Sequence, residues 1–161
     1  MKIPDWTLRL PMNLISSKAK DYQLDVGIVA AIVWQESRGS IYAARYETNY
    51  KYLVRPDHFA KLLNISQVTE EVQQKTSYSL MQIMGGTARW LGMDGALPSL
   101  FKPECNLYWG CKYLAYLQNK YGPGTDLVAA YNAGSPRKTA GGLYENEAYV
   151  DAVMNYYRDL A

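Results

Sequence analysis

The chain has 161 residues, of which 48% are hydrophobic and 20% charged, and its formal net charge is +2. This size and composition predict one globular domain, 1–161, with enough chain for a sizeable core. Acidic and basic residues are mixed along the chain, so there is no basic stripe of the kind that binds a phosphate backbone. We therefore expect no nucleic-acid partner.

The N-terminal stretch, the cysteines and the histidine exclude further classes. Residues 1–14 lack the basic region and apolar core of a signal peptide, and no stretch approaches the ~20 apolar residues of a membrane span. Cys105 and Cys111 lie six residues apart in one predicted helix, ~9 Å along its axis, so both are expected to be reduced. His58 is the only histidine and has no cysteine near it. We therefore predict no membrane insertion, no disulfide and no metal site.

The pattern of apolar residues predicts a succession of short helices and no strand. Proline, glycine and capping residues mark the boundaries. In chain order the predicted helices cover 11–22, 25–38, 57–63, 66–75, a turn at 80–84 that Gly85-Gly86 ends, 87–92 and 104–122. The next helix is capped by Thr125 or Asp126 and runs to Gly134, and a last helix opens at Asn146. The aromatic and charged stretch 40–56 is expected to form a loop. The predicted fold class is all-α.

The helix predicted from Asp25 to Arg38 ends near a carboxylate. Asp25 is a favourable N-cap, and the apolar face of this helix leads to Glu36 at the i, i+3, i+4, i+7 spacing. Aliphatic neighbours and the negative end of the helix dipole both disfavour the charged form and raise the pKa of a carboxyl group. Glu36 is therefore a candidate proton donor near neutral pH. The alternative is a glutamate that turns out to solvent.

Two amides also stand in apolar surroundings. Gln82 lies within SLMQIM and Asn132 within AAYNAG. A buried amide without a partner costs ~1–3 kcal/mol, so each needs a hydrogen-bond partner or a ligand. Gln82 alternatively caps neighbouring backbone, and Asn132 alternatively belongs to a helix end at Gly134. Taken together with Glu36, the two amides predict a site in one cleft.

Four segments resemble, in the same order, the motifs of the soluble lytic transglycosylase family. They are Glu36-Ser37, SLMQIM at 79–84, AYNAG at 130–134 and YVDAV at 149–153. The resemblance spans nearly the whole chain. It implies a lysozyme-like all-α fold of short helices around a substrate cleft, and cleavage of the glycan strands of bacterial peptidoglycan. It also matches Glu36 to the catalytic acid of the family.

The chemistry that the resemblance implies needs one acid and no cofactor. Glu36 protonates the β-1,4 oxygen between N-acetylmuramic acid and N-acetylglucosamine, then takes the proton of the C6 hydroxyl, which gives a 1,6-anhydro sugar without water. Gln82 and Asn132 are expected to hold sugar or acetamido groups, and Met84 and Tyr131 to line the cleft. Tyr149 is expected to hydrogen-bond near the acid.

The sequence departs from the family pattern at two positions. Ser79 replaces a glycine, so the backbone there must avoid positive φ or carry strain. Arg45 replaces a serine that many members place nine residues after the acid. Ser77 or Tyr149 is a possible substitute as hydroxyl donor to Glu36.

Two other functions remain open. A muramidase of the same fold needs a second carboxylate to activate water, and Glu47 is the best-placed candidate. The alternative for Glu47 is an ion pair with a neighbouring arginine. A non-catalytic glycan-binding or structural component of a phage or secretion apparatus is the second. The expected place of action is the cell wall, on the periplasmic or extracellular side, with delivery by a virion or another system.

Overall fold

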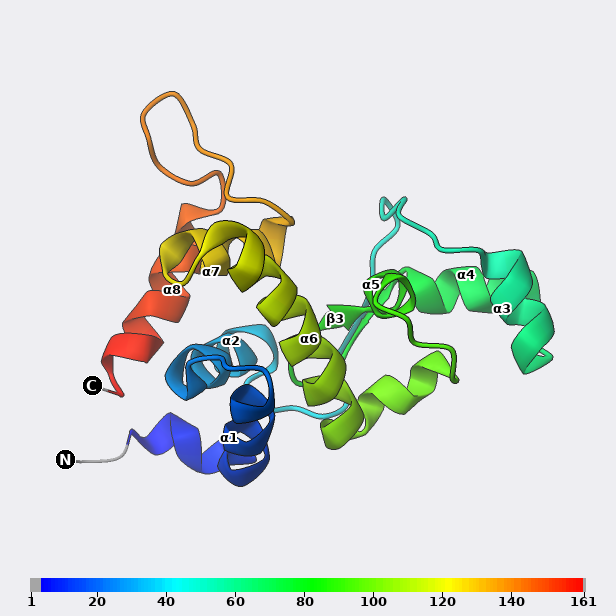
Figure 1. The fold of residues 1–161 in the computed structure, drawn as a ribbon, viewed down its shortest axis with the longest axis horizontal. Coiled ribbons are helices and arrows are strands. Elements are labelled where there is room, and N and C mark those ends of the chain that lie inside the picture. Colours follow the sequence, from blue (N-terminus) through cyan, green and yellow to red (C-terminus); the bar gives the residue numbers. More distant parts are fainter. Residues whose placement is uncertain (1–3, 161) are drawn as a thin grey trace. The chain divides into compact units, whose positions relative to one another are not determined.

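A computed structural model describes residues 4–160, and in it the chain forms two compact units (Figure 1). The first unit runs to Gly39 and resumes at Cys111, and the second covers Ser40–Gly110. Of the N-terminal stretch searched for a leader, residues 1–3 lie outside the described part. The single domain expected from the length of the chain stays a prediction.

The first unit consists of helices. It contains the 3-10 helix η1 (Asp5–Arg9), α1 (Met12–Asp21), α2 (Val26–Ser37), the part of α6 (Pro103–Tyr121) that begins at Cys111, α7 (Thr125–Ala133) and α8 (Glu147–Arg158). The apolar run of α2 forms its centre, since Val29, Ile32 and Val33 are fully buried. The Asp25 carboxylate accepts a hydrogen bond from the backbone N–H of Ile28 at 3.1 Å, which confirms the predicted N-cap.

α8 packs along α2, and tyrosines fix the pair at both ends. Near the start of α2, Tyr157 of α8 donates a hydrogen bond to the Asp25 carboxylate at 2.9 Å. A Cβ at Gly27 would lie 2.9 Å from the Tyr157 ring, so only glycine allows this approach. Near the end of α2, Tyr149 of α8 reaches Glu36. The two helices are therefore antiparallel.

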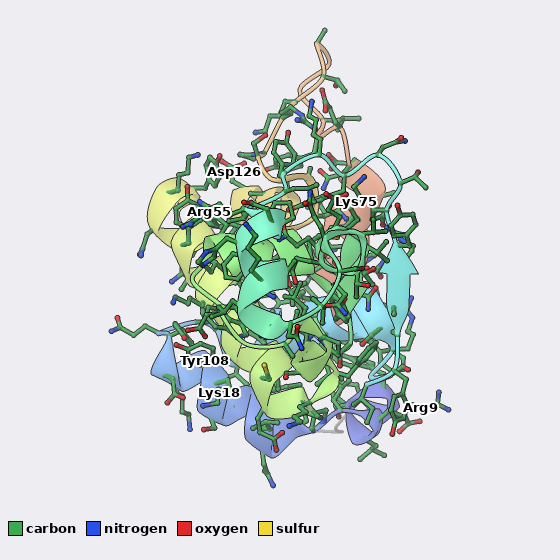
Figure 2. All side chains as sticks on the ribbon, turned by 90° about the vertical axis from the view of Figure 1, so that its right-hand side faces the viewer. Arg9, Lys18, Arg55, Lys75, Tyr108 and Asp126 are labelled. Atoms are coloured by element: carbon green, nitrogen blue, oxygen red, sulfur yellow. The ribbon has the colours of Figure 1, made fainter. Side chains whose placement is uncertain are left out.

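A projecting arm, residues 135–146, connects α7 to α8 (Figure 1). Its two sides pair through a bridge between Lys138 and Tyr144. The Tyr144 hydroxyl donates to Asp126 at the start of α7, whose place is labelled in Figure 2. Arg137 and Glu145 form an ion pair at 2.8 Å. The root of the arm is therefore held by several polar contacts.

The second unit combines helices with a small sheet. It contains β1 (Ala44–Tyr46), α3 (Pro56–Leu63), α4 (Gln67–Gln74), β2 (Thr76–Tyr78), β3 (Ile83–Met84), α5 (Gly85–Trp90), the 3-10 helix η2 (Leu97–Phe101) and the first part of α6. The sheet is antiparallel in the order β1-β2-β3, with Arg45 opposite Ser77 and Ser77 opposite Met84. The fold is mostly helical, as predicted, but the expectation of no strand was wrong.

The turn expected at 80–84 was assigned to the wrong element. Ile83 and Met84 form a strand, and Gly85-Gly86 begins α5 instead of ending a helical turn. A Cβ at Gly85 would lie 2.3 Å from the Gln73 carbonyl oxygen, and one at Gly86 would lie 2.6 Å from the Tyr50 hydroxyl. These glycines are therefore needed for close packing of the start of α5.

A buried ion pair holds the helical side of the second unit. Arg89 of α5 and Glu70 of α4 are joined by two hydrogen bonds of 2.7 and 3.0 Å, and both side chains are fully buried. Gln74 donates a further hydrogen bond to Glu70 at 2.9 Å. Arg89 also donates to the carbonyls of Met93 and Gly95. Because its charges are paired and hydrogen-bonded, the cluster is compatible with burial.

Within residues 4–160, no helix is both long and apolar enough to cross a membrane.

Candidate functional site

Glu36 lies in the last turn of α2 and is partly buried. Its Oε1 accepts a hydrogen bond of 2.6 Å from the hydroxyl of Tyr149, which stands 113 residues later in α8. A short bond from a hydroxyl to an ionised carboxylate belongs to the strong class of hydrogen bonds. Tyr149, one of the two hydroxyl donors expected from the sequence, therefore contacts the candidate acid.

Burial and the nearby Glu36 carboxylate raise the pKa of Tyr149 well above its ordinary value. Ionisation would remove the proton that Tyr149 donates and would place two negative charges side by side. The same two causes, in the same order, raise the pKa of Tyr131 on α7. Both phenols therefore stay protonated throughout the neutral range.

Tyr131 lies close enough to the candidate acid to interact with its charge. Its side chain is buried, with 8% exposed, and its ring lies 5.6 Å from the ring of Tyr113 on α6. Tyr131 belongs to the AYNAG segment, whose helix α7 ends at Gly134 with a φ of 79°. The structure therefore brings Glu36, Tyr131 and Tyr149 together from three helices of the first unit.

Asn132 differs from Tyr131 in its surroundings. The sequence suggests an amide embedded among apolar residues, but the Asn132 side chain is exposed. Its Oδ1 accepts a hydrogen bond of 3.0 Å from Asn146, which also donates to the carbonyl of Ala129 at 3.1 Å. Asn146 directly precedes α8, so it opens the last helix as predicted. Its side chain also holds the amide of Asn132 in place.

The remaining predicted residues lie in the second unit, on the hairpin of β2 and β3. The Gln82 amide nitrogen donates to the carbonyls of Ala43 and Ser79 at 3.0 and 2.8 Å. Its Oε1 accepts from the Ser77 hydroxyl at 2.9 Å. Met84 lies opposite Ser77 in the sheet. The contacts of Gln82 are therefore those of the backbone-capping alternative.

Ser79 adopts the strained conformation that the sequence offered as one of two options. Its φ is 58°, in the left-handed region that favours glycine. The Ser79 side chain is fully buried, and its hydroxyl has no hydrogen-bond partner among the described residues. Gln82, at the other end of the same turn, also has a positive φ, of 46°. The backbone of this turn is therefore strained, and the hydrogen bonds of Gln82 offset part of the cost.

Glu47, the candidate second carboxylate, is engaged by a neighbour. Its Oε1 lies 2.5 Å from Nε of Arg45. The Arg45 side chain is mostly exposed, so this pair contributes little to stability. The contact is nevertheless the arginine ion pair given as the alternative for Glu47.

A group of side chains near the candidate acid was not predicted from the sequence. Arg38, directly after α2, contacts Trp34 and Tyr156, and Trp6 packs on both rings. The one available signal was the spacing of Tyr149 and Tyr156, which places both on one side of the last helix. In residues 4–160, no group of three or more His, Cys, Asp or Glu side chains is arranged to hold a metal ion.

The fold and the site are those of a helical protein with one partly buried acid held by a tyrosine. Comparison with known proteins identifies the family to which this chain belongs. Residues 13–149 match the family model described as the transglycosylase SLT domain. The chain belongs to this family, and membership implies cleavage of peptidoglycan glycan strands.

The chain is also similar to individual proteins. Two curated proteins named "X polypeptide", from Escherichia coli and from its strain K12, are each 30% identical to this chain over 140 residues, which is 86% of this chain and 68% of theirs. The structure is similar to that of an inactive mutant of lytic transglycosylase Slt from Pseudomonas aeruginosa, with a TM-score of 0.65 and 21% identity. That match covers 95% of this chain and 24% of the solved one. It shows the lysozyme-like fold, and the chain spans about a quarter of the solved protein.

Proposed function

We propose that this chain is a peptidoglycan lytic transglycosylase in which Glu36 acts first as general acid and then as general base. Its target is the β-1,4 bond between N-acetylmuramic acid and N-acetylglucosamine. The observation that supports this most directly is the 2.6 Å hydrogen bond from Tyr149 to the Glu36 carboxylate. It joins two of the four motifs at the carboxylate that the reaction would use.

In the first half of the proposed reaction, the Glu36 proton passes to the glycosidic oxygen and the bond from that oxygen to C1 of N-acetylmuramic acid breaks. The leaving N-acetylglucosamine takes the proton, and positive charge develops at C1. The neighbouring N-acetyl oxygen of the substrate stabilises this charge. Because Glu36 is already partly buried, part of its desolvation precedes the binding of substrate.

In the second half, the Glu36 carboxylate removes the proton from the C6 hydroxyl of the same sugar, and that oxygen forms the new bond to C1. Glu36 is then protonated again, and no water is consumed. Tyr149 donates to the carboxylate, so it stabilises the intermediate state in which Glu36 is charged. The raised pKa of Tyr149 supports this role, because the phenol keeps its proton while Glu36 cycles.

Two further residues of the first unit fit contacts to the sugar. Asn132 offers an exposed amide whose orientation Asn146 fixes, and amides bind hydroxyl and acetamido groups. Tyr131 supplies an apolar ring beside Glu36. Contacts from Ser77, Gln82 and Met84 to the sugar stay predictions, and in Gln82 most hydrogen-bonding capacity serves the hairpin.

The muramidase alternative needs Glu47 as a base that activates water. The ion pair with Arg45 favours the structural role, since it already engages the Glu47 carboxylate. A non-catalytic glycan-binding module is the other alternative. The hydrogen bond from Tyr149 holds the Glu36 carboxyl group in a defined position. This supports the enzyme over the binding module, because a module that only binds glycan does not need a positioned acid. Delivery to the cell wall and a phage origin stay predictions.

The test is digestion of purified peptidoglycan followed by mass spectrometry of the products. We expect muramic acid termini one water lighter than the hydrolysis product. Glu36→Gln removes the proton and keeps the size, so cleavage should vanish while the protein stays folded. Glu47→Gln is the matched control and should cleave at a rate near that of the wild type. Hydrated termini would favour the muramidase, and a Glu36→Gln protein that cleaves normally would refute the proposal.

A further inference from the structure

A second residue beside Glu36 joins the end of α2 to α8. Glu36 receives the hydrogen bond from Tyr149, and Arg38, two residues later, donates one from Nη1 to the hydroxyl of Tyr156 at 2.8 Å. Tyr149 and Tyr156 are about two helical turns apart, on the same side of α8. The contact of Arg38 therefore fixes the same pair of helices that sets the distance between Glu36 and Tyr149.

Arg38 contacts two aromatic rings through its guanidinium group. Its guanidinium carbon lies 5.2 Å from the ring centre of Trp34 and 5.3 Å from that of Tyr156. The two rings meet edge to face at 6.5 Å. Trp6 of η1 stacks on Trp34 at 5.8 Å and meets Tyr156 at 5.7 Å. Arg38, Trp34, Tyr156 and Trp6 form what we call the arginine clamp.

Arg38 occupies a backbone conformation that usually favours glycine, although its side chain is long and charged. Its φ is 55°, in the left-handed conformation that follows many helices and that glycine adopts at least cost. Gly39 comes next with a φ of 80°, and a Cβ there would lie 2.5 Å from the Arg9 carbonyl oxygen. The chain thus leaves α2 in a constrained path, and the Arg38 side chain is directed back along Trp34.

The end of a helix is the part that frays first, because its last carbonyls have no partner within the helix. A displacement of about 1 Å at a catalytic group can lower a rate ~100-fold. We infer that Arg38 is a positioning residue, which holds the last turn of α2 against α8 so that Glu36 and Tyr149 stay within hydrogen-bond distance. This inference rests on the function proposed above.

The titratable groups near Glu36 influence the pH dependence of cleavage. They include Tyr149 from α8 and Tyr131 from α7, and Tyr131 in turn faces Cys111 and Tyr113 of α6. The positive charge of Arg38 offers a competing explanation for any effect of its removal, because a cation near a carboxylate favours the charged form. The variants must therefore separate position from charge.

Arg38→Asn is the main variant, since asparagine tolerates the left-handed conformation but cannot reach the rings. Tyr156→Phe keeps the ring and the charge of Arg38 and removes only the hydrogen bond. Arg158→Ala, an exposed arginine on α8, is the matched control. Each is made in the full chain, with and without Tyr149→Phe, and assayed on soluble glycan strands for kcat, KM, the pH profile of kcat/KM and the melting temperature.

We expect Arg38→Asn to lower kcat about tenfold with KM little changed, and to melt within about 4 °C of the wild type. The alkaline limb of its pH profile should move to higher pH, as in Tyr149→Phe. Tyr156→Phe should give a smaller change in the same direction. In the Tyr149→Phe background, Arg38→Asn should have little further effect, because its effect acts through Tyr149. Arg158→Ala should match the wild type.

Three results would overturn the inference. The first is a normal kcat in Arg38→Asn, and the second is an undiminished effect of Arg38→Asn when Tyr149 is already Phe. The third is a normal kcat in Tyr156→Phe together with a lowered kcat in Arg38→Asn, which would assign the effect to the charge of Arg38. Tyr156→Phe keeps the packed rings, so it decides the matter if Arg38→Asn does not fold. Glu36→Gln separates the two proposals. If it cleaves normally the function is wrong, whereas an inactive Glu36→Gln beside a normal Arg38→Asn refutes only the positioning role.

Discussion

Tyr149 and Glu36 are joined by a hydrogen bond of 2.6 Å between two helices that pack along each other, α8 and α2. The donor comes from the last motif of the chain and the acceptor from the first. Because the phenol pKa is raised, Tyr149 remains a donor at every pH at which the enzyme would work. The pair is therefore a fixed arrangement of one acid and one donor.

Tyr149→Phe should slow cleavage ~10-fold or more and shift its pH dependence. A hydrogen bond to a charged group contributes ~1.5–3 kcal/mol, and here it stabilises the ionised carboxylate that acts as the base. Without it the protonated form is favoured, so the alkaline limb of the rate profile should move to higher pH. Tyr156→Phe, on the same helix, provides a comparison in which the Tyr149 hydroxyl is retained. An unchanged profile in Tyr149→Phe would show that the bond does not act in the reaction.

Asn132→Ala should lower the cleavage rate about tenfold while the protein keeps its stability. The side chain is exposed and has one hydrogen bond, from Asn146, so its loss should cost less than ~1 kcal/mol of unfolding free energy. A contact to the sugar that positions it for reaction acts directly on the barrier. Asn155→Ala, an exposed asparagine of α8, is the control. Equal rates in the two variants would remove Asn132 from the site.

Gln82→Ala should chiefly lower stability. The change leaves the carbonyls of Ala43 and Ser79 and the hydroxyl of Ser77 without this partner. We expect a loss of ~2–3 kcal/mol in unfolding free energy, measured by urea denaturation. Gln67→Ala, on the exposed side of α4, removes a single surface contact and should lose less than ~0.5 kcal/mol. A Gln82→Ala protein as stable as the wild type would contradict the structural role.

Glu47→Gln should cost little activity. Its carboxylate pairs with exposed Arg45, and such surface pairs contribute ~0–1 kcal/mol. The expected rate is within about twofold of the wild type, with the same anhydro products. If Glu47 instead activated water, the rate would fall by orders of magnitude and the wild type would give reducing ends. Product mass and rate on one batch of peptidoglycan distinguish these outcomes.

The parts of the fold that follow from local patterns could be predicted. The helix α2 has its cap, its apolar face and its end within one short segment, and the spacing of those residues is sufficient to find it. The sheet could not be found in this way, because strands of two or three residues are too short to show a period of two. Their pairing depends on partners distant in the chain.

The start of α5 shows why a local rule failed. In the sequence, Gly85-Gly86 resembles the end of a helix. In the structure, glycine is required at both positions because Gln73 and Tyr50 leave no room for a side chain. That reason exists only in the folded chain. The candidate site shows the same division. Glu36 and Tyr149 were found through motifs, whereas the contact of Arg38 with Tyr156 depends on how α2 and α8 meet.

Ser79→Gly should raise stability, because this position combines two costs. A residue other than glycine in the left-handed region costs ~1 kcal/mol, and the buried Ser79 hydroxyl has no partner among the described residues. Glycine removes both costs, although it makes the unfolded chain more flexible and so returns part of the gain. We expect a net increase of ~1 kcal/mol in unfolding free energy. Ser79→Ala removes the hydroxyl but keeps the strain, so the difference between the two variants measures the backbone term. A Ser79→Gly protein less stable than Ser79→Ala would show that the turn carries no strain that glycine relieves.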